Sequence, residues 1–489
     1  MSSSASVGID VGTTGVKGVA VDEDGVVLGV AEAGYPFSTP FPGWVEQDPE
    51  EWWRATESVL EQLRAAAGAP AGIGLSGQMH GLVALDSADR VVRPSILWND
   101  QRTAAQCEQI ERTIGRRRLV ELTGNRAIPG FTAPKMLWMR ESEPELWARV
   151  TRVMLPKDYV RLRLCGEHAT DVSDASGTLL LDVGARSWSA EVLEALELDA
   201  DLLPEVLESA VVSGTRADGV PIAAGAGDQA AGALGVGVSH PGPLSIVLGT
   251  SGVVFAASDE FRSDPEGRLQ AFCHARPAAW HVMGVMQSAA GSLGWARDTL
   301  APGTPFDELL DGADGWPPGV EGLIFLPYLA GERTPHVDPD ARGAFAGMSL
   351  RHDRAALIRA VLEGVAFGLR DCLDLISELG IETTLGRVSG GGARSRLWLE
   401  IVASALELPL ELVAVQEGAA FGAALLGGVA AGVWDDVDTA IGATVRPGSR
   451  IEPVSDWIEP YREAQVHYRA LYPALRDAAL AGASDSATH

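Results

Sequence analysis

Apolar and polar positions alternate at the start of the chain in the way expected for strands. Residues 7–12 read VGIDVG, in which every second position is a large apolar residue, and this predicts a strand. The turn Gly-Thr-Thr-Gly at 12–15 leads into a second predicted strand at 16–21, and Asp-Gly at 24–25 leads into a third. The chain is therefore expected to open as a β-meander with a Gly/Thr loop between its first two strands.

Helices and strands then alternate. Asp48 is suited to cap a helix, Pro49 suits the first helical position and Glu51 completes a capping box, so a helix is predicted to run to about Leu63. Strands are predicted at 72–77 and 82–86, and the alternation continues to about residue 240. This pattern is typical of an α/β domain.

A short segment rich in proline and glycine, VSHPGPL at 238–244, is predicted to be a domain boundary. The segment SIVLGTSGVVFAASDE at 245–260 follows it and matches VGIDVGTTGVKGVAVDED at 7–24: strand, Gly-Thr-Thr/Ser-Gly, strand, acidic residues. Such an internal repeat predicts two domains of one fold, each presenting a Gly-Thr hairpin. We expect an N-terminal domain at 1–240, a C-terminal domain at 241–445, and a helical extension with a disordered tail at 446–489.

The second half also carries a long amphipathic pattern. It predicts a helix at 353–379, with Gly380 where a C-terminal cap belongs. Further elements are expected as follows: a strand at 387–389, a triple glycine at 390–392, and helices at 395–406 and 418–431.

Composition narrows the functional classes. The 489 residues are 46% hydrophobic and 21% charged, which is usual for a globular protein, and the net charge of −28 disfavours nucleic acid and anionic membranes as partners. The sequence contains no run of 18 apolar residues, so no membrane-spanning helix is predicted. Four well-separated cysteines without a CxxC pair favour a reduced, cytoplasmic setting.

The two Gly-Thr hairpins are candidate phosphate sites. Gly12 and Gly15 allow positive φ, so backbone N–H groups can turn toward an anion, and Thr13 and Thr14 add hydroxyl donors. Residues 249–252 (Gly-Thr-Ser-Gly) repeat this chemistry. One such hairpin is usually a plain tight turn, but two matched copies at the starts of two domains favour phosphate binding.

Two aspartates are candidates for catalysis. Asp10 ends the first predicted strand, where a carboxylate can hold Mg²⁺ through water; the alternative is a turn-capping role. Asp228 lies between an apolar strand and a helix of small residues, where it can accept a proton from an attacking hydroxyl; the alternative is that it caps the helix.

Polar turns are candidate sugar sites. Gln78 and His80, in the turn GQMHG, offer directional donors and acceptors for hydroxyls, although a plain surface turn is the alternative. Trp98 could cover sugar C–H groups and Asp100 could bind hydroxyls. The triple glycine at 390–392 lets backbone approach a nucleotide closely, while neither a GxGxxG fingerprint nor a P-loop occurs.

Together these residues resemble the FGGY carbohydrate kinases, within the actin-like ATPase superfamily. The resemblance covers roughly residues 7 to 445 and rests on GQMHG at 77–81, LWND at 97–100, GERTP at 331–335 and RAALIRAVLEGVAF at 354–367. It implies an α/β fold of two actin-like (ribonuclease H-like) ATPase domains flanking a central cleft. It also implies ATP-dependent phosphorylation of the terminal hydroxyl of a ketopentose, D-xylulose, with ATP and Mg²⁺ as cofactors, a small sugar as partner, and a homodimer as a further expectation.

The resemblance also assigns residues. It makes Asp228 the catalytic base and places Asp10 and Asp228 at the metal. The residues that it implies for the sugar are Gln78, Met79, His80, Trp98, Asp100, Gln229 and Arg333. Those that it implies for the nucleotide are Thr13, Thr14, Lys17, Gly249, Thr250, Ser251, Gly391, Gly392 and Arg394.

The chain departs from the family pattern at three positions: Gln229 stands where many members carry Asn, Ala356 where an acidic residue is usual, and Ser142 where an amide, acid or His is usual. The change at Gln229 leaves the sugar open. Two alternatives therefore remain: a kinase for another polyol, ketose or sugar acid, and a non-catalytic actin-like ATP-binding module.

Overall fold

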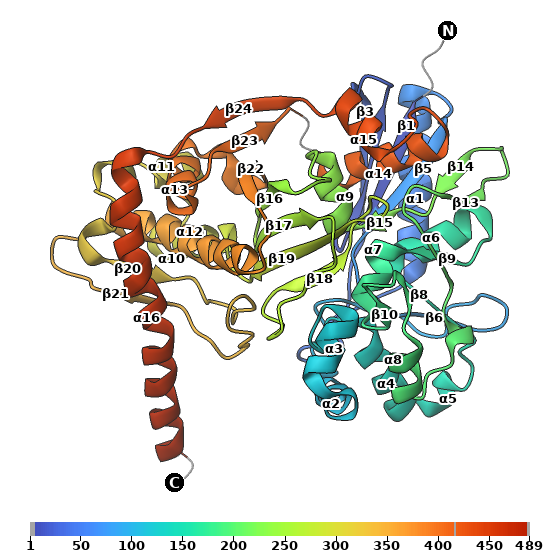
Figure 1. Cartoon of the computed structure of the whole chain (residues 1–489), viewed down its shortest axis with the longest axis horizontal. Helices are drawn as coiled ribbons and strands as arrows, with labels where there is room; N and C mark the ends of the chain where they lie inside the picture. The colour runs from blue at the N-terminus through green and yellow to red at the C-terminus, as the bar shows by residue number, and fades with distance from the viewer. Residues whose placement is uncertain (1–4, 415–416, 487–489) are drawn as a thin grey trace. The chain divides into compact units, whose positions relative to one another are not determined.

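The computed structural model describes residues 5–414 and 417–486, and the chain divides into two compact units. Unit 1 comprises residues 1–240, 257–281 and 415–446; unit 2 comprises residues 241–256, 282–414 and 447–489. Two seven-stranded sheets, flanked by helices, form the framework (Figure 1). The α/β class predicted from the sequence is confirmed.

The first sheet carries its strands in the order β13-β14-β5-β1-β2-β3, with β15 paired to β5. Strand β1 is antiparallel to β2 and parallel to β5, so the opening meander is followed by a crossover. The strands of this sheet are β1 (Ser6–Val11), β2 (Gly15–Val21), β3 (Val27–Gly34), β5 (Gly72–Gly77), β13 (Val212–Thr215), β14 (Pro221–Ala223) and β15 (Ala226–Gly227).

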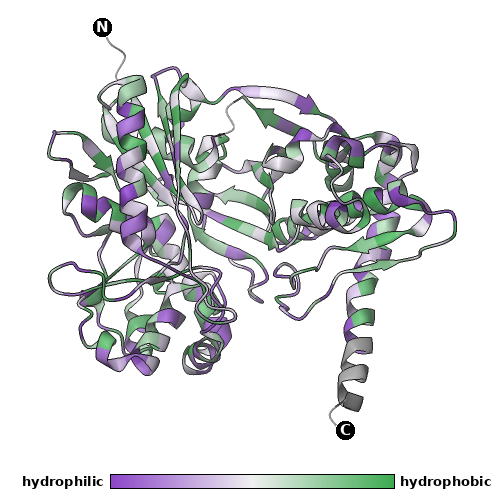
Figure 2. Cartoon of the chain, turned by 180° about the vertical axis from the view of Figure 1, so that it is seen from behind, coloured by the Kyte–Doolittle hydropathy of each residue, from purple (hydrophilic) through white to green (hydrophobic). Residues whose placement is uncertain are grey.

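Helices cover both faces of this sheet. Helix α1 (Pro49–Ala67) packs over β2 and β3, and α14 (Gly418–Ala430) packs over β1 and β5. Glycines allow the close approach: a Cβ at Gly8 would lie 1.9 Å from the carbonyl oxygen of Ala420, and one at Gly18 would lie 2.4 Å from Val59 of α1. Figure 2 shows the sheet strands mostly in the green of apolar residues, as a layer buried between helices requires.

The second sheet has the order β18-β19-β17-β16-β22-β23-β24 and repeats the plan of the first. Strand β16 is antiparallel to β17 and parallel to β22, which again follows a crossover. The internal repeat predicted from the sequence is thus confirmed in the topology. The strands are β16 (Gly242–Leu248), β17 (Gly252–Ser258), β18 (Gln270–Cys273), β19 (Trp280–Met286), β22 (Thr383–Ser389), β23 (Leu410–Val413) and β24 (Pro447–Ile451).

The predicted helix ends agree with local chemistry. Asp48 caps α1, because its carboxylate accepts a hydrogen bond from the backbone N–H of Glu50 at 3.0 Å. Helix α12 (Arg354–Glu378) is followed by Gly380 at a φ of 73°, a left-handed conformation that glycine adopts without strain. The remaining helices that bear on the site are α4 (Thr132–Ser142), α6 (Pro156–Cys165), α7 (Val172–Ala175), α9 (Asp228–Gly235), α10 (Ala290–Leu300), α11 (Phe306–Leu309) and α13 (Arg396–Leu406).

The C-terminal part differs from the expected division. Residues 415–446, expected in a C-terminal domain, belong to unit 1, because α14 and α15 (Val437–Thr444) share an apolar core with Val19 and Val21 of β2. The final helix α16 spans Ser455–Ser486, so helix extends into the segment expected to be disordered, while residues 487–489 lie outside the described residues.

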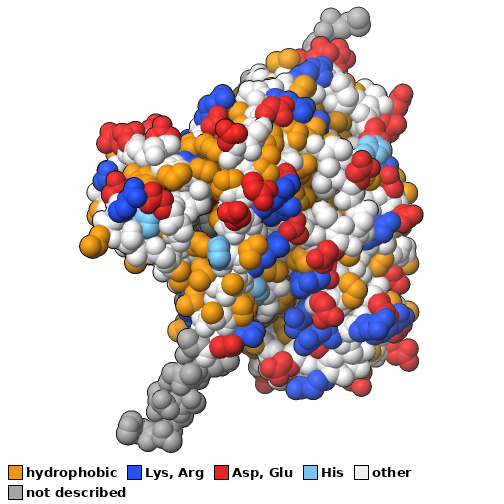
Figure 3. All heavy atoms as spheres, turned by 60° about the vertical axis from the view of Figure 1, so that its left-hand side comes forward, with side chains coloured by type: hydrophobic (Ala, Val, Ile, Leu, Met, Phe, Trp, Pro, Cys, Tyr) orange, Lys and Arg blue, Asp and Glu red, His pale blue; other side chains and the backbone are white. Residues whose placement is uncertain are grey.

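The described surface is mixed in character. On the face shown in Figure 3, acidic and basic side chains lie interspersed among apolar ones. Among the described residues, no helix combines the length and apolarity needed to span a bilayer.

Candidate active site

Three strand ends bring the predicted catalytic and sugar residues of unit 1 together. Strand β5 runs parallel to both β1 and β15, so the carboxyl ends of all three strands lie at one edge of the sheet. The backbone N–H of Gln78 donates to the carbonyl oxygen of Val11 at 2.8 Å, and Gly227 pairs in register with Gly77. A candidate site at this edge agrees with the general position of ligands in open α/β sheets.

Asp10 and Asp228 form a carboxylate pair at this edge. Both are half-buried, and burial together with the charge of Asp10 raises the pKa of Asp228 to about 7. Burial also raises the pKa of Asp10 to about 6, because the neighbouring Ser76 hydroxyl and the positive charge of Lys17 offset only part of the effect. A carboxyl group whose pKa lies close to neutral pH is suited to accept a proton during a reaction.

Asp228 does not cap its helix. It occupies the first helical position of α9, Gly227 is the N-cap, and no side-chain capping bond is present. The N-cap role of the alternative interpretation therefore does not apply to Asp228, although Gln229 in the same turn interacts with its carboxylate. Asp10 likewise has one buried oxygen, Oδ1, with no hydrogen-bond partner among the described residues.

A buried ionic cluster supports the backbone before Asp228. The backbone N–H of Gly227 donates to Ser173 Oγ at 3.1 Å, and this hydroxyl donates to Asp171 Oδ2 at 2.6 Å. Asp171 is in turn paired with Lys157, whose Nζ lies 2.6 Å from Asp158, 2.8 Å from Asp171 and 3.2 Å from Asp174. Lys157 and all three acids are fully buried. The cluster could not be predicted from the sequence, since Lys157 and Asp158 lie on α6 whereas Asp171 and Asp174 come from a later part of the chain.

The predicted sugar turn is packed against Asp228. An added Cβ at Gly227 would lie 2.8 Å from Met79 Sδ, so Met79 contacts the residue before the candidate base. His80 Nδ1 lies 2.7 Å from the carbonyl oxygen of Gly177. Its backbone adopts a left-handed φ of 73°, and this strained turn is held from α4, where Lys135 Nζ donates to the His80 carbonyl oxygen at 2.8 Å.

The first Gly-Thr hairpin is tightly bonded. The N–H of Gly12 donates to the Gly15 carbonyl oxygen at 3.0 Å, and Thr13 Oγ1 donates to Gln78 Oε1 at 3.1 Å. The indole N–H of Trp98, a side chain 39% exposed, donates to Thr13 Oγ1 at 3.0 Å. Thr14 is exposed at the hairpin tip.

Lys17 is engaged in ion pairs. Its Nζ pairs with Glu417, at the start of α14, and lies 3.4 Å from Glu32. Burial alone would lower the pKa of Lys17, but the hydrogen bonds and charges of the two glutamates raise it. Its amine is therefore held as a cation beside the Asp10 strand.

Three other predicted sugar residues have different surroundings. Asp100 is fully buried, and its carboxylate accepts hydrogen bonds from Arg102 and from the Val45 N–H at 2.6 Å. In this structure its carboxylate is engaged by Val45 and Arg102, and its predicted role in sugar binding stays a prediction. Gln229 follows Asp228 in α9, whereas Arg333 belongs to unit 2, so these predicted sugar residues are not all gathered in one unit.

Unit 2 contains the second hairpin and a cavity. The carbonyl oxygens of Gly249 and Thr250 accept hydrogen bonds from Ala290 and Ala289, at 2.7 and 2.8 Å, which fasten residues 249–251 to the start of α10. A cavity of about 420 Å³ includes three predicted nucleotide residues in its lining. The lining residues are Ala290, Leu293, Phe306, Asp307, Leu310, Gly391, Gly392, Arg394, Ser395 and Trp398.

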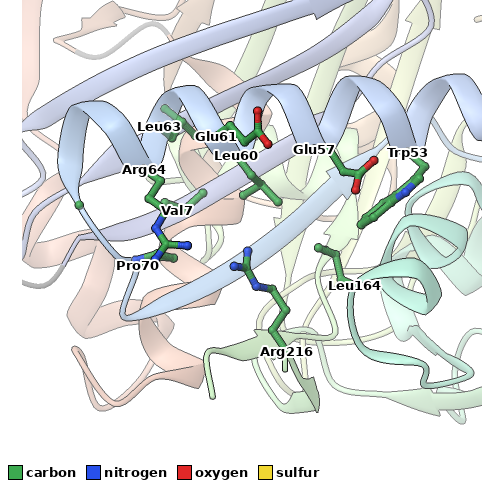
Figure 4. Close-up of a pocket in the computed structure, with 11 residues that line it drawn as sticks. Val7, Trp53, Glu57, Leu60, Glu61, Leu63, Arg64, Pro70, Leu164 and Arg216 are labelled. Atoms are coloured by element: carbon green, nitrogen blue, oxygen red, sulfur yellow. The ribbon is translucent and has the colours of Figure 1, made fainter. Parts of the chain in front are cut away.

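A second cavity, of about 320 Å³, lies along α1 (Figure 4). Glu57, Glu61 and Arg64 of α1 and Arg216, which directly follows β13, line it, together with Val7 at the opposite end of β1 from Asp10. It does not include any of the predicted site residues, so we do not assign it to the active site.

Comparison with known proteins agrees with the arrangement described above. The family models of the N-terminal and C-terminal domains of the FGGY family of carbohydrate kinases match residues 5–235 and 244–431. The chain therefore belongs to the FGGY family of carbohydrate kinases and is a sugar phosphotransferase that uses ATP.

Individual relatives are similar over most of their length. The xylulose kinase of Escherichia coli strain K12 is 43% identical over 437 residues, which cover 87% of this chain and 90% of that protein. The crystal structure of a xyloylose kinase from Brucella ovis has a TM-score of 0.92 and 43% identity, covering 97% of this chain and 99% of that one. A gluconate kinase from Lactobacillus acidophilus also reaches a TM-score of 0.92, with 27% identity and coverage of 97% and 98%.

Proposed function

We propose that this kinase phosphorylates D-xylulose at its terminal hydroxyl, giving D-xylulose 5-phosphate and ADP. The observation that carries the mechanism is the carboxylate pair of Asp10 and Asp228 beside the turn that holds Met79 and His80. The choice of sugar is supported by the relatives, since those with 36–43% identity over most of the chain include several xylulose kinases.

Asp228 acts as the base in this proposal. The O5 proton passes to its carboxylate while a bond forms between O5 and the γ-phosphorus. The bond from that phosphorus to the β,γ-bridging oxygen breaks, and ADP leaves. Backbone N–H groups of the residue 12–15 hairpin other than that of Gly12, which bonds to the Gly15 carbonyl oxygen, bind the transferred phosphoryl group in this proposal, and the cavity that includes Gly391 and Gly392 binds the adenosine.

The carboxylate pair also fits Mg²⁺. This ion keeps most of its waters and takes few protein ligands, so two carboxylates with a buried, unpaired oxygen on Asp10 suit its hydrated form. We propose that Asp10 and Asp228 hold Mg²⁺ through its waters, and that the ion when bound offsets phosphate charge. The bound charge would also favour the ionised form of both acids.

A sugar panel tests the substrate. The purified chain is assayed for ADP release with D-xylulose, D-ribulose, L-xylulose, glycerol and D-gluconate, the last because of the gluconate kinase relative. We expect the highest kcat/KM with D-xylulose. A higher value with any other sugar would replace the substrate, and no sugar-stimulated turnover would favour the binding-module alternative.

Location and assembly are the last parts of the proposal. The four cysteines are all free, three of them buried, which together with the use of ATP supports a cytoplasmic enzyme. A homodimer stays a prediction. Sedimentation velocity at several protein concentrations tests it by measuring whether the chain is a monomer or a dimer.

A further inference from the structure

A closed ring of hydrogen bonds begins and ends at Thr13. Its hydroxyl donates to Gln78 Oε1 at 3.1 Å, Gln78 Nε2 donates to Gln47 Oε1 at 3.0 Å, and Gln47 Nε2 donates back to the Thr13 carbonyl oxygen at 2.6 Å. Gln47, from β4 (Glu46–Gln47), and Gln78 are 2% and 3% exposed, so bulk water does not replace these bonds.

The direction of every bond in the ring is fixed. Gln47 Oε1 also accepts from the indole N–H of Trp52 at 3.0 Å, and its Nε2 is also 3.3 Å from the Pro36 carbonyl oxygen. If the Gln47 amide were reversed, its NH₂ group would face two donors and its oxygen would face two carbonyl oxygens. The amide is therefore held in one orientation, and it holds Thr13 in turn.

The ring connects two ligand sites. On one side it fixes the residue 12–15 hairpin, which carries the phosphate N–H donors. On the other side Gln78 belongs to the sugar turn, and Trp98 donates to the same Thr13 hydroxyl from its exposed position. Because the single hydroxyl proton of Thr13 is given to Gln78, this hydroxyl is occupied as a donor, and the hairpin meets an anion through its backbone N–H groups.

We propose that Gln47 is a positioning residue that couples sugar binding to nucleotide binding through the Thr13–Gln78–Gln47 ring. A sugar that binds against Trp98 and the 77–81 turn favours one position of the Thr13 side chain. The hydrogen bonds of the ring then favour the matching position of the hairpin backbone. Coupling between two sites is reciprocal, so the nucleotide tightens sugar binding by the same factor. The proposal rests on the kinase function proposed above.

The variants are chosen to separate coupling from stability. Gln47→Glu keeps the acceptor for Trp52 and Gln78 but removes the donor to the Thr13 carbonyl oxygen. Gln47→Leu removes the whole link at similar size. Trp52→Phe is the matched control: it removes another buried bond to the same Gln47 and leaves the ring closed.

The measurement is the dissociation constant of the sugar, by calorimetry, with and without a non-hydrolysable Mg·ATP analogue. The sugar is the best substrate of the wild-type panel, so a wrong sugar assignment is found before the ring is tested. We expect the analogue to tighten sugar binding in the wild type and in Trp52→Phe. In Gln47→Glu and Gln47→Leu we expect the sugar dissociation constants measured without and with the analogue to have a ratio close to one. The constant measured without the analogue should differ from the wild-type value by less than about threefold.

A kinetic readout accompanies the binding ratio. Loss of the ring should displace the hairpin and lower kcat by about 10²-fold, because an error of about 1 Å in the placement of reacting groups costs this much in rate. The KM for the sugar should change little. Wild-type coupling retained in Gln47→Glu would overturn the proposal. So would the absence of tightening in the wild type, or an equal loss of coupling in Trp52→Phe, which would make Gln47 merely structural.

Discussion

Replacing Asp228 with Asn should slow phosphoryl transfer by about 10²–10⁴ and yet stabilise the fold above neutral pH. Folding raises the pKa of this carboxyl to about 7, by burial and the nearby charge of Asp10. An acid whose pKa is higher in the folded state binds more protons when folded, so stability falls as pH rises from about 4 to about 7. Asn carries no charge and avoids this loss.

The size of the effect follows from the shift in pKa. A rise from 3.8 to about 7 is about three units at about 1.4 kcal/mol each, an upper limit of about 4 kcal/mol at pH 8. Because the side chain is only half-buried, we expect about 2 kcal/mol. By the same linkage the gain at pH 8 should be about twice that at pH 5.5.

The assay is urea denaturation of wild type and Asp228→Asn at pH 5.5 and pH 8 without Mg²⁺. The control is Asp436→Asn, because hydrogen bonds from the backbone N–H and side chain of Thr439 lower the pKa of Asp436, so its replacement should give no gain at either pH. Equal midpoints for wild type and Asp228→Asn at pH 8, or a gain independent of pH, would refute the electrostatic reasoning.

Three further predictions follow from other parts of the structure. Lys157→Met should destabilise unit 1 by about 3–5 kcal/mol in urea, because the buried Asp171 and Asp174 lose the cation that pairs with them, while Asp158 keeps Arg161; a loss below about 0.5 kcal/mol would contradict this. Leu293→Trp, which fills the cavity beside Gly391, should raise the KM for ATP about tenfold, about 1.4 kcal/mol of binding, and leave sugar affinity unchanged; an effect on the sugar alone would remove this cavity from the nucleotide site. The kcat/KM for the sugar, measured from pH 5 to 9 with saturating Mg·ATP, should rise with pH to a plateau as Asp228 ionises, with a midpoint below the metal-free pKa of about 7 because bound Mg²⁺ favours the carboxylate; a profile that falls as pH rises over the acid limb would contradict Asp228 as the base.

Much of the framework could be predicted from local signals. Alternation at 7–12, the Asp48 cap and Gly380 after α12 are short-range features, and each is confirmed by the structure. The repeat of the Gly-Thr hairpin is a comparison within the chain and needs no long-range geometry. These signals give the α/β class and the paired topology of the two sheets.

Contacts between distant segments could not be predicted in this way. Gln47 is an ordinary polar residue in sequence, and only the fold brings it to Gln78 and to Thr13. Asp100 in the LWND motif had suggested a ligand, but its burial against Arg102 depends on the packing around it. The membership of 415–446 in unit 1 also follows from packing, since nothing in those residues alone specifies the sheet that they cover.

The central claim is that this chain phosphorylates O5 of D-xylulose with Asp228 as the base. The most direct measurement is ³¹P NMR of the product formed from Mg·ATP and D-xylulose by wild type, Asp228→Asn and Asp436→Asn. We predict D-xylulose 5-phosphate from wild type and Asp436→Asn, and a rate lower by about 10²–10⁴ from Asp228→Asn. Phosphorylation at another position, or near wild-type turnover by Asp228→Asn, would contradict it.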